Sequence, residues 1–207
     1  MRTFPTAFES QKVLTFYPAK PEQIGGDILE IGPGRGDFLL SMAGQCPDKR
    51  FVAVELAKKR FYKLIPRIER RGLSNILLIN GNAGLIIPEL ISAETFEKIY
   101  VLFPDPWPKR RHIPHRLMSI SFIEHLTRIL KPGGDIFAAT DFWSYADWIT
   151  DNFRQVSQLR CQGAPFFTDI SHIPFYHPTY YEQKWRGIGL AIYYMHYRKI
   201  AAADHNG

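Results

Sequence analysis

The feature that most constrains the fold of this chain is an alternation between short apolar runs and longer amphipathic segments. The apolar runs have the length of buried strands, and the segments between them space their apolar residues as helices do. This alternation predicts an α/β fold with a mostly parallel sheet and helices on both faces. Strands are expected at residues 27–31, 51–55, 75–80, 98–103, 135–140 and 189–199, and helices at 37–45, 57–71, 116–130 and 144–158.

The length and composition are those of one domain. The chain has 207 residues, of which 45% are hydrophobic, enough for a sizeable core. No internal repeat or low-complexity linker divides it. We therefore expect an irregular lead-in over residues 1–26, a single domain over 27–200 and a flexible tail over 201–207.

Charge and cysteine content limit the classes of function. Lys and Arg outnumber Asp and Glu by 26 to 20, and the resulting net charge of +6 favours a polyanionic partner. Cys46 and Cys161 stand far apart and outside any CxxC pattern, which argues against a zinc site or a disulfide scaffold. Because no signal peptide or membrane-spanning run is visible, we expect a cytoplasmic protein that binds no membrane and no metal.

A glycine-rich loop follows the first expected strand. Residues 30–36 read EIGPGRG, with GxGxG spacing rather than the GxGxxG of dinucleotide sites. The glycines would let the backbone approach a ligand closely, and Glu30 would suit a ligand that carries an ammonium group, as S-adenosylmethionine does. The alternative interpretation is a tight strand-to-helix turn without a ligand.

Two further polar residues lie where expected strands end. Glu55 closes the second strand roughly twenty residues after the glycine loop, where a carboxylate can accept hydrogen bonds from ribose hydroxyls. Asn82 follows the third strand and could hydrogen-bond an adenine amino group, although Asn-Gly sequences are also ordinary turns. Ligands of parallel sheets bind beyond the carboxyl ends of the strands, so one shared site is expected.

The segment after the fourth strand carries the most specific signal. Residues 103–112 read FPDPWPKRRH, and three prolines hold Asp105 and Trp107 in a fixed relation. A carboxylate can accept hydrogen bonds from the Watson–Crick edge of guanine, and a tryptophan can stack on a base. The alternative is a stiff, solvated surface loop. The cationic cluster of this segment, which suits phosphates, consists of Lys109, Arg110, Arg111 and Arg116.

On these residues, the chain resembles the bacterial tRNA (guanine-N7-)-methyltransferases from residue 28 to residue 185. The motifs are the glycine loop 30–36, the VEL segment 54–56, the PDPWPKRRH run 104–112, Thr140-Asp141 with Tyr145, and TYYEQKW at 179–185. The glycine loop is common to many methyltransferases, whereas DPWPKRRH with a downstream TxYE segment is highly specific. The resemblance implies a Rossmann-like class I methyltransferase with a mostly parallel seven-stranded sheet and an antiparallel last strand.

The resemblance also implies the reaction and its site. S-adenosyl-L-methionine is the expected methyl donor, leaving as S-adenosyl-L-homocysteine, and the acceptor is the variable-loop guanine at tRNA position 46. Asp105 is the expected catalytic residue. Together with the glycine loop, the expected cofactor contacts are Glu30, Gly32, Gly34, Gly36, Glu55, Asn82 (where the family commonly carries Asp) and Asp105. The tRNA contacts that the resemblance implies are Lys109, Asp141, Thr179, Tyr180, Tyr181 and Glu182, and the cationic cluster adds Arg110, Arg111 and Arg116.

The chemistry of N7 sets what these residues are expected to do. N7 of guanine has a lone pair and no proton, so its attack on a sulfonium methyl needs no general base. Asp105 is therefore expected to orient the reactants and to complement the migrating charge, while Asp141 and Glu182 read the guanine edge or stabilise its charge. The alternatives are a methyltransferase for another base or amino group, a non-catalytic RNA-binding module and a nicotinamide dehydrogenase. The protein is expected to be a monomer or a homodimer.

Overall fold

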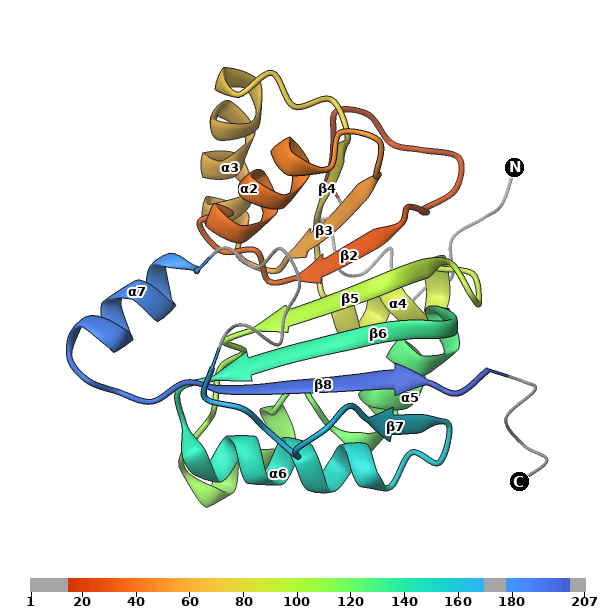
Figure 1. Ribbon diagram of the computed structural model, residues 1–207. Helices are drawn as coiled ribbons and strands as arrows, with labels where there is room; N and C mark the ends of the chain where they lie inside the picture. Colours follow the sequence, from red (N-terminus) through yellow and green to blue (C-terminus); the bar gives the residue numbers. More distant parts are fainter. Residues whose placement is uncertain (1–14, 170–177, 202–207) are drawn as a thin grey trace.

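One eight-stranded sheet organises the computed structural model, which describes residues 15–169 and 178–201 (Figure 1). Across the sheet the strand order is β1-β4-β3-β2-β5-β6-β8-β7. The strands are β1 (Thr15–Tyr17), β2 (Ile28–Ile31), β3 (Phe51–Glu55), β4 (Ile76–Asn80), β5 (Phe96–Leu102), β6 (Leu130–Thr140), β7 (Leu159–Cys161) and β8 (Tyr193–Lys199).

The predicted, mostly parallel sheet is confirmed, with one strand more than the seven expected. Strands β4, β3, β2, β5 and β6 pair in parallel, whereas β8 runs antiparallel to β6 and β7 runs antiparallel to β8. The eighth strand is β1, which pairs antiparallel with the edge strand β4. It lies within the predicted irregular lead-in. A three-residue strand is too short to show periodicity in the sequence, and it depends on the hydrogen-bonding edge of β4.

Helices cover both faces of the sheet. Alternate side chains of each strand point to opposite faces, so Ile28 and Phe51 pack in one core while Leu29 and Val52 pack in the other. The first core includes α2 and α3, and the second includes α4, α5 and α6. The helices are α2 (Asp37–Gln45), α3 (Lys58–Arg70), α4 (Ala83–Leu90), α5 (Ile120–Ile129), α6 (Trp143–Arg154) and α7 (Tyr180–Gly187), with a 3-10 helix η1 (Arg110–His115).

Several boundaries differ from those predicted. Helix α4 was not predicted from the sequence; in the structure the Asn82 side chain caps its first turn. Helix α5 begins at Ile120 rather than at residue 116, since the Ser119 hydroxyl accepts a hydrogen bond from the Phe122 amide. The predicted strand 189–199 begins at Tyr193, after α7, which was also not predicted. In the predicted tail, residues 202–207 lie outside the described part of the chain.

This topology brings four loops together. Strands β3, β2, β5 and β6 are parallel neighbours, so the segments that follow them emerge at the same edge of the sheet. The order reverses at β2, whose neighbours are β3 and β5, and such a switch point is where open α/β sheets bind ligands. Within the described residues, no helix has the length and apolarity needed to span a bilayer.

Candidate active site

A cleft of about 490 Å³ opens at this edge of the sheet. Gly32, Glu55, Asn82, Asp105 and Trp107 all line it, from the segments that follow β2, β3, β4 and β5. A smaller pocket of about 50 Å³ adjoins the cleft and is lined by Glu30 and Gly34, with residues 179–181 on its other side. The structure therefore brings together the glycine loop, the strand-end carboxylates and the Pro-rich loop, as the sequence predicted for a shared site.

The glycine loop adopts a conformation that side chains would resist. Gly32, Gly34 and Gly36 all have left-handed backbone angles, with φ of 71°, 58° and 76°. At Gly36, which precedes α2, a Cβ atom would lie 2.3 Å from a terminal carbon of Leu64 in α3. The positive φ therefore favours glycine at this position, and a Cβ atom here would also have to displace the end of the Leu64 side chain.

Glu55 holds the glycine loop in place. Its side chain is 3% exposed, one carboxylate oxygen accepts a hydrogen bond from the Gly34 amide at 2.9 Å, and the other accepts from the Ala57 amide at 2.7 Å. The carboxylate therefore ties the loop after β2 to the start of α3. Each carboxylate oxygen has a second lone pair, so Glu55 can still accept hydrogen bonds from a ligand in the cleft.

Glu30 is buried without this support. It is 2% exposed, and among the described residues its Oε2 atom has no hydrogen-bond partner. Burial, followed by the negative charges of Glu55 and Asp37, raises the pKa of Glu30 to about 8. At neutral pH its carboxyl group is thus held in the protonated form, and a cation in the small pocket would favour ionisation. An unpartnered carboxyl at a glycine loop fits a ligand with an ammonium group.

The Pro-rich loop after β5 is strained on both sides of Asp105. Phe103 and Trp107 have left-handed φ values of 54° and 42°, which non-glycine residues rarely adopt. Trp107 packs edge-on against His112, with ring centroids 5.4 Å apart, and tilts against His115 at 5.5 Å. The strain and these ring contacts hold exposed Asp105 and Trp107 at the mouth of the cleft.

The structure divides the predicted cationic cluster. Lys109, Arg110 and Arg111 are exposed, two to four residues after Trp107 of the cleft, and their contact with phosphates stays a prediction. Arg116 is only 8% exposed, its Nε atom donates to the Pro106 carbonyl at 2.9 Å, and its guanidinium lies 5.0 Å from the centre of the Tyr145 ring. The expectation that Arg116 contacts phosphates is therefore corrected, because its side chain braces the Pro-rich loop against α6.

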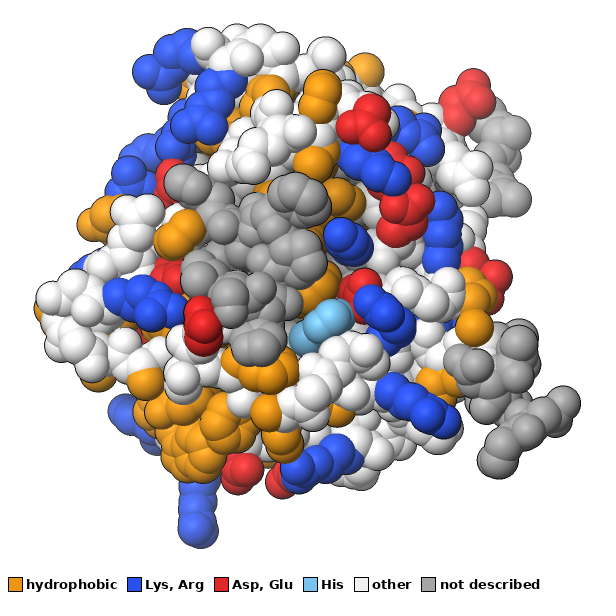
Figure 2. Space-filling view, in the orientation of Figure 1, with side chains coloured by type: hydrophobic (Ala, Val, Ile, Leu, Met, Phe, Trp, Pro, Cys, Tyr) orange, Lys and Arg blue, Asp and Glu red, His pale blue; other side chains and the backbone are white. Residues whose placement is uncertain are grey.

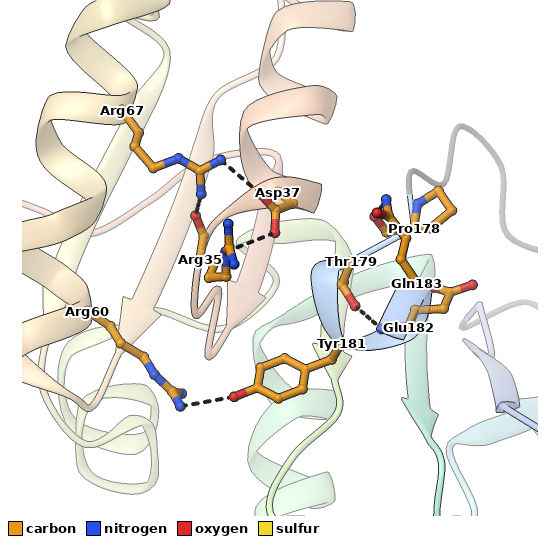
Figure 3. Close-up of polar contacts among 9 residues, drawn as sticks. All are labelled: Arg35, Asp37, Arg60, Arg67, Pro178, Thr179, Tyr181, Glu182 and Gln183. Carbon is orange, nitrogen blue, oxygen red and sulfur yellow. Dashed lines mark hydrogen bonds and ion pairs between the residues drawn. The ribbon is translucent and has the colours of Figure 1, made fainter. Parts of the chain in front are cut away.

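Helix α7 contributes the far wall of the small pocket (Figure 3). Thr179 caps the helix by accepting a hydrogen bond from the Glu182 amide. The guanidinium of Arg35 lies 4.0 Å from the centre of the Tyr180 ring, and Arg60 of α3 donates to the Tyr181 hydroxyl at 3.4 Å. The sequence singled out Thr179, Tyr180 and Tyr181, but it missed Arg35 and Arg60, whose only signal was their position in the glycine loop and in a basic helix.

Two predicted guanine-reading residues are not in these cavities. Glu182 is fully buried on the inner side of α7, where its Oε1 atom accepts hydrogen bonds from the Tyr194 hydroxyl and from Arg186 Nε. The predicted contact of Glu182 with guanine is therefore corrected, and the residue instead anchors α7 to β8. Asp141 directly follows β6, is half-buried, and lines neither the cleft nor the small pocket.

Asn82 lines the cleft, but its side chain already has a structural partner. The amide oxygen accepts a hydrogen bond from the Gly84 amide at 2.9 Å and so caps α4. One lone pair of that oxygen and both amide hydrogens face no other partner among the described residues. Asn82 can thus hold the helix start and still offer a donor or an acceptor to a ring in the cleft.

Comparisons with known proteins agree with this geometry. A family model described as "Putative methyltransferase" matches residues 26–195. The tRNA (guanine-N(7)-)-methyltransferase of Nitrosomonas eutropha is 36% identical over 84% of this chain and 76% of its own. The enzyme of that name from Syntrophotalea carbinolica is 29% identical over 83% and 73% of the two chains.

Solved structures support the fold. A SAM dependent methyltransferase from Aquifex aeolicus has a TM-score of 0.59 at 12% identity, covering 87% of this chain and 85% of its own. The 16S rRNA methyltransferase KamB has a TM-score of 0.61 at 15% identity, covering 96% and 95%. At these identities the likeness concerns the arrangement of strands and helices.

Proposed function

This chain belongs to the family of tRNA (guanine-N(7)-)-methyltransferases, and from that premise we propose that it methylates N7 of a guanine in tRNA. The methyl donor is S-adenosyl-L-methionine, which supplies an electrophilic methyl group on a sulfonium centre. By resemblance to the family, the proposed acceptor is the variable-loop guanine at position 46. The observation that carries the proposal is that buried Glu30, the glycine loop, Glu55 and Asp105 line the cleft and the small pocket that adjoins it.

The residues present fit the methyl donor. Glu30 offers a buried, unpartnered carboxyl oxygen for an ammonium group, beside a glycine loop whose backbone leaves room for a ligand. Glu55 lines the cleft with acceptor capacity for ribose hydroxyls, and Asn82 does so for an adenine ring. The positive charge of a bound ammonium group would offset the free-energy cost of ionising the buried Glu30 carboxyl, so this residue would select a ligand that carries a positive charge.

Asp105 acts by position and charge. Guanine N7 has a lone pair and no proton, so none of the residues of the cleft needs to remove a proton. The Pro-flanked loop holds the Asp105 carboxylate at the mouth of the cleft, where positive charge moves toward the guanine ring. Trp107, at the same mouth, would wall or stack on the base and exclude water from the reacting atoms.

The exposed groups around the cleft would bind tRNA. Lys109, Arg110 and Arg111 lie beside the Pro-rich loop and would contact phosphates. Tyr180 and Tyr181 are 44% and 39% exposed and would offer rings for bases near the target guanine. Asp141 stays a proposed guanine contact. For this contact, the base would have to lie next to the carboxyl end of β6, outside the cleft. With tRNA as substrate, we place the protein in the cytoplasm.

The proposal is tested by product analysis. Purified protein is incubated with labelled S-adenosylmethionine and bulk tRNA that lacks 7-methylguanosine, and the nucleosides are identified by mass spectrometry. We expect 7-methylguanosine as the product, mapped by fragmentation to the variable loop. A different methylated nucleoside would assign another methyltransferase activity, and binding of tRNA without transfer would indicate a non-catalytic module.

A further inference from the structure

Helix α3 presents a basic face that the proposed reaction does not use. Arg60, Lys63, Arg67 and Arg70 are spaced three or four residues apart, so they lie on one side of the helix along about 15 Å of its axis. The neighbouring side carries buried Phe61, Leu64 and Ile68 and packs on the sheet. The basic residues are therefore displayed to solvent by the same helical period that buries the apolar ones.

Few carboxylates neutralise this face. The only acidic residue of α3 is Glu69, which accepts a hydrogen bond from the Tyr17 hydroxyl at 3.1 Å. Arg67 forms an ion pair with Asp37 at 2.9 Å, whereas Lys63 and Arg70 form none within residues 15–169 and 178–201. Figure 2 shows Lys and Arg side chains gathered over α3 at the upper left of the molecule. A positive potential at this surface follows.

The basic face lines a groove that runs into the active site. The groove has a volume of about 460 Å³ and is lined by Arg35, Arg60, Lys63, Arg67 and Arg70, with Gly34 and Leu64 at its base; we call it the α3 groove. Arg35 and Arg60 also line the small pocket, and Arg60 lines the cleft as well. Figure 3 shows Arg60 and Arg67 reaching from α3 toward the glycine loop and α7. A polyanion in the groove would thus extend directly from the site of methyl transfer.

We propose that the α3 groove binds the sugar-phosphate backbone of the tRNA, next to the nucleotide that is methylated. The inference rests on the proposed function, because it takes the occupant of the adjoining cleft to be a tRNA guanine. Arginine and lysine along one helix face match a row of phosphates, which is sequence-independent binding. The tRNA would then be held on two sides, by α3 and by residues 109–111 beyond the Pro-rich loop.

The test is charge reversal at the two groove residues farthest from the reacting groups, K63E/R70E. The matched control, R50E/R160E, makes the same change in net charge at two exposed arginines outside the groove, one before β3 and one on β7. Binding of unmodified tRNA is measured from about 50 to 200 mM salt. We expect K63E/R70E to lower the slope of log affinity against log salt by about one to two units, and to weaken binding at least tenfold at low salt.

Further measurements separate the groove from the fold and from the proposed function. S-adenosylmethionine binding without tRNA and kcat at saturating tRNA should stay within about twofold of the unmodified protein, while KM for tRNA rises. The neutral variant K63Q/R70Q should lower the tRNA affinity and its salt slope by a smaller amount. This variant tests the groove even if the charge-reversed protein misfolds. Equal tRNA binding in K63E/R70E and R50E/R160E would overturn the inference, even if the protein makes 7-methylguanosine. If the protein does not methylate tRNA but K63E/R70E still lowers the salt slope of tRNA binding, only the proposed function would be overturned.

Discussion

The carboxylates at the ends of β2 and β3 and the groups on the Pro-rich loop and α7 face the same cavities, but the protein holds them in different ways. Glu30 and Glu55 are almost fully buried on strands in the middle of the sheet. Asp105 is exposed on a strained loop, and Tyr180 and Tyr181 are exposed on a helix at the far wall. In the proposed function, the buried strand ends form the cofactor half of the site and the exposed outer segments form the half that meets tRNA.

The two strand-end carboxylates also differ from each other. Glu55 accepts hydrogen bonds from two backbone amides, which stabilise its charged form. Glu30, one strand away, has an unpartnered oxygen and a raised pKa. Glu55 is therefore part of the frame of the site, whereas the free oxygen of Glu30 would gain its partner from a ligand. Substitutions in each region should affect different steps, and they are taken below from the largest expected effect to the smallest.

Asp105→Ala should have the largest effect, on methyl transfer itself. Removal of one preorganised electrostatic group should lower the single-turnover rate by about 10²- to 10³-fold, because the other carboxylate that lines the cleft, Glu55, already accepts hydrogen bonds from two backbone amides. Asp105 lies on an exposed loop, so the melting temperature should change little. Near-normal turnover in a folded variant would show that Asp105 has no role in methyl transfer. It would also count against the assignment of the Pro-rich loop to the reacting half of the site.

Glu55→Ala should weaken S-adenosylmethionine binding by about 1–3 kcal/mol in the absence of tRNA, because a charged acceptor is lost. It should also lower the melting temperature, since the Gly34 and Ala57 amides lose their acceptor. Calorimetric binding and thermal unfolding measure the two effects. Glu55→Gln, which keeps one acceptor oxygen, is the matched control. Its cofactor affinity and melting temperature should lie between those of the unmodified protein and those of Glu55→Ala. An unchanged dissociation constant would mean that Glu55 supports the loop without touching the cofactor.

Glu30→Gln should weaken cofactor binding by roughly tenfold and abolish its pH dependence. Between pH 4.5 and about 8, Glu30 is protonated in the folded state but ionised in the unfolded chain. The free energy of unfolding therefore falls as pH rises through that window. An ammonium group needs the ionised carboxylate, so binding should release a proton and the affinity should rise from pH 6 to 8. Calorimetry in buffers of different ionisation enthalpy measures that proton. If the affinity of the unmodified protein for S-adenosylmethionine does not change with pH, a contact between Glu30 and the ammonium group is contradicted.

Glu182→Gln should act on α7 rather than on guanine recognition. Loss of charge at a buried group paired with Tyr194 and partly exposed Arg186 should lower the free energy of unfolding by about 1–3 kcal/mol. Methylation should recover when the assay temperature is lowered, and cofactor binding should be retained. A rate that stays low at every temperature in a folded variant would show that Glu182 leaves its buried position to read the base.

Neutralising the exposed run should have the smallest effect for each residue. Substitution of Lys109, Arg110 and Arg111 by Gln should lower the salt slope of tRNA binding by about one unit or less per residue and spare cofactor binding. Arg116→Gln is the contrast, because it should lower the melting temperature with little change in the slope. If Arg116→Gln lowers the salt slope of tRNA binding as much as the substitutions at residues 109–111, Arg116 contacts a tRNA phosphate after all.

Much of the fold could be predicted because it depends on local patterns. Runs of apolar residues at strand length predicted β2, β3, β4 and β5 to within two residues at each end, and they predicted β6 and β8 correctly at their carboxyl ends. Strands β1 and β7 and helix α7 could not be found in this way. Each is short, and two of them add to sheet edges whose position depends on residues far away in the sequence.

By itself, the sequence determined the α/β fold, the common edge of the strands and the residues that would stand there, because neighbouring parallel strands carry the segments that follow them to one place. Only the tertiary structure decided which charged side chains face the ligand. Arg116 and Glu182 both belong to motifs of polar residues, yet the packing of Tyr145 on one and Tyr194 on the other turns them inward. Burial of a charge depends on which partners pack against it, and no spacing of residues along the chain records that.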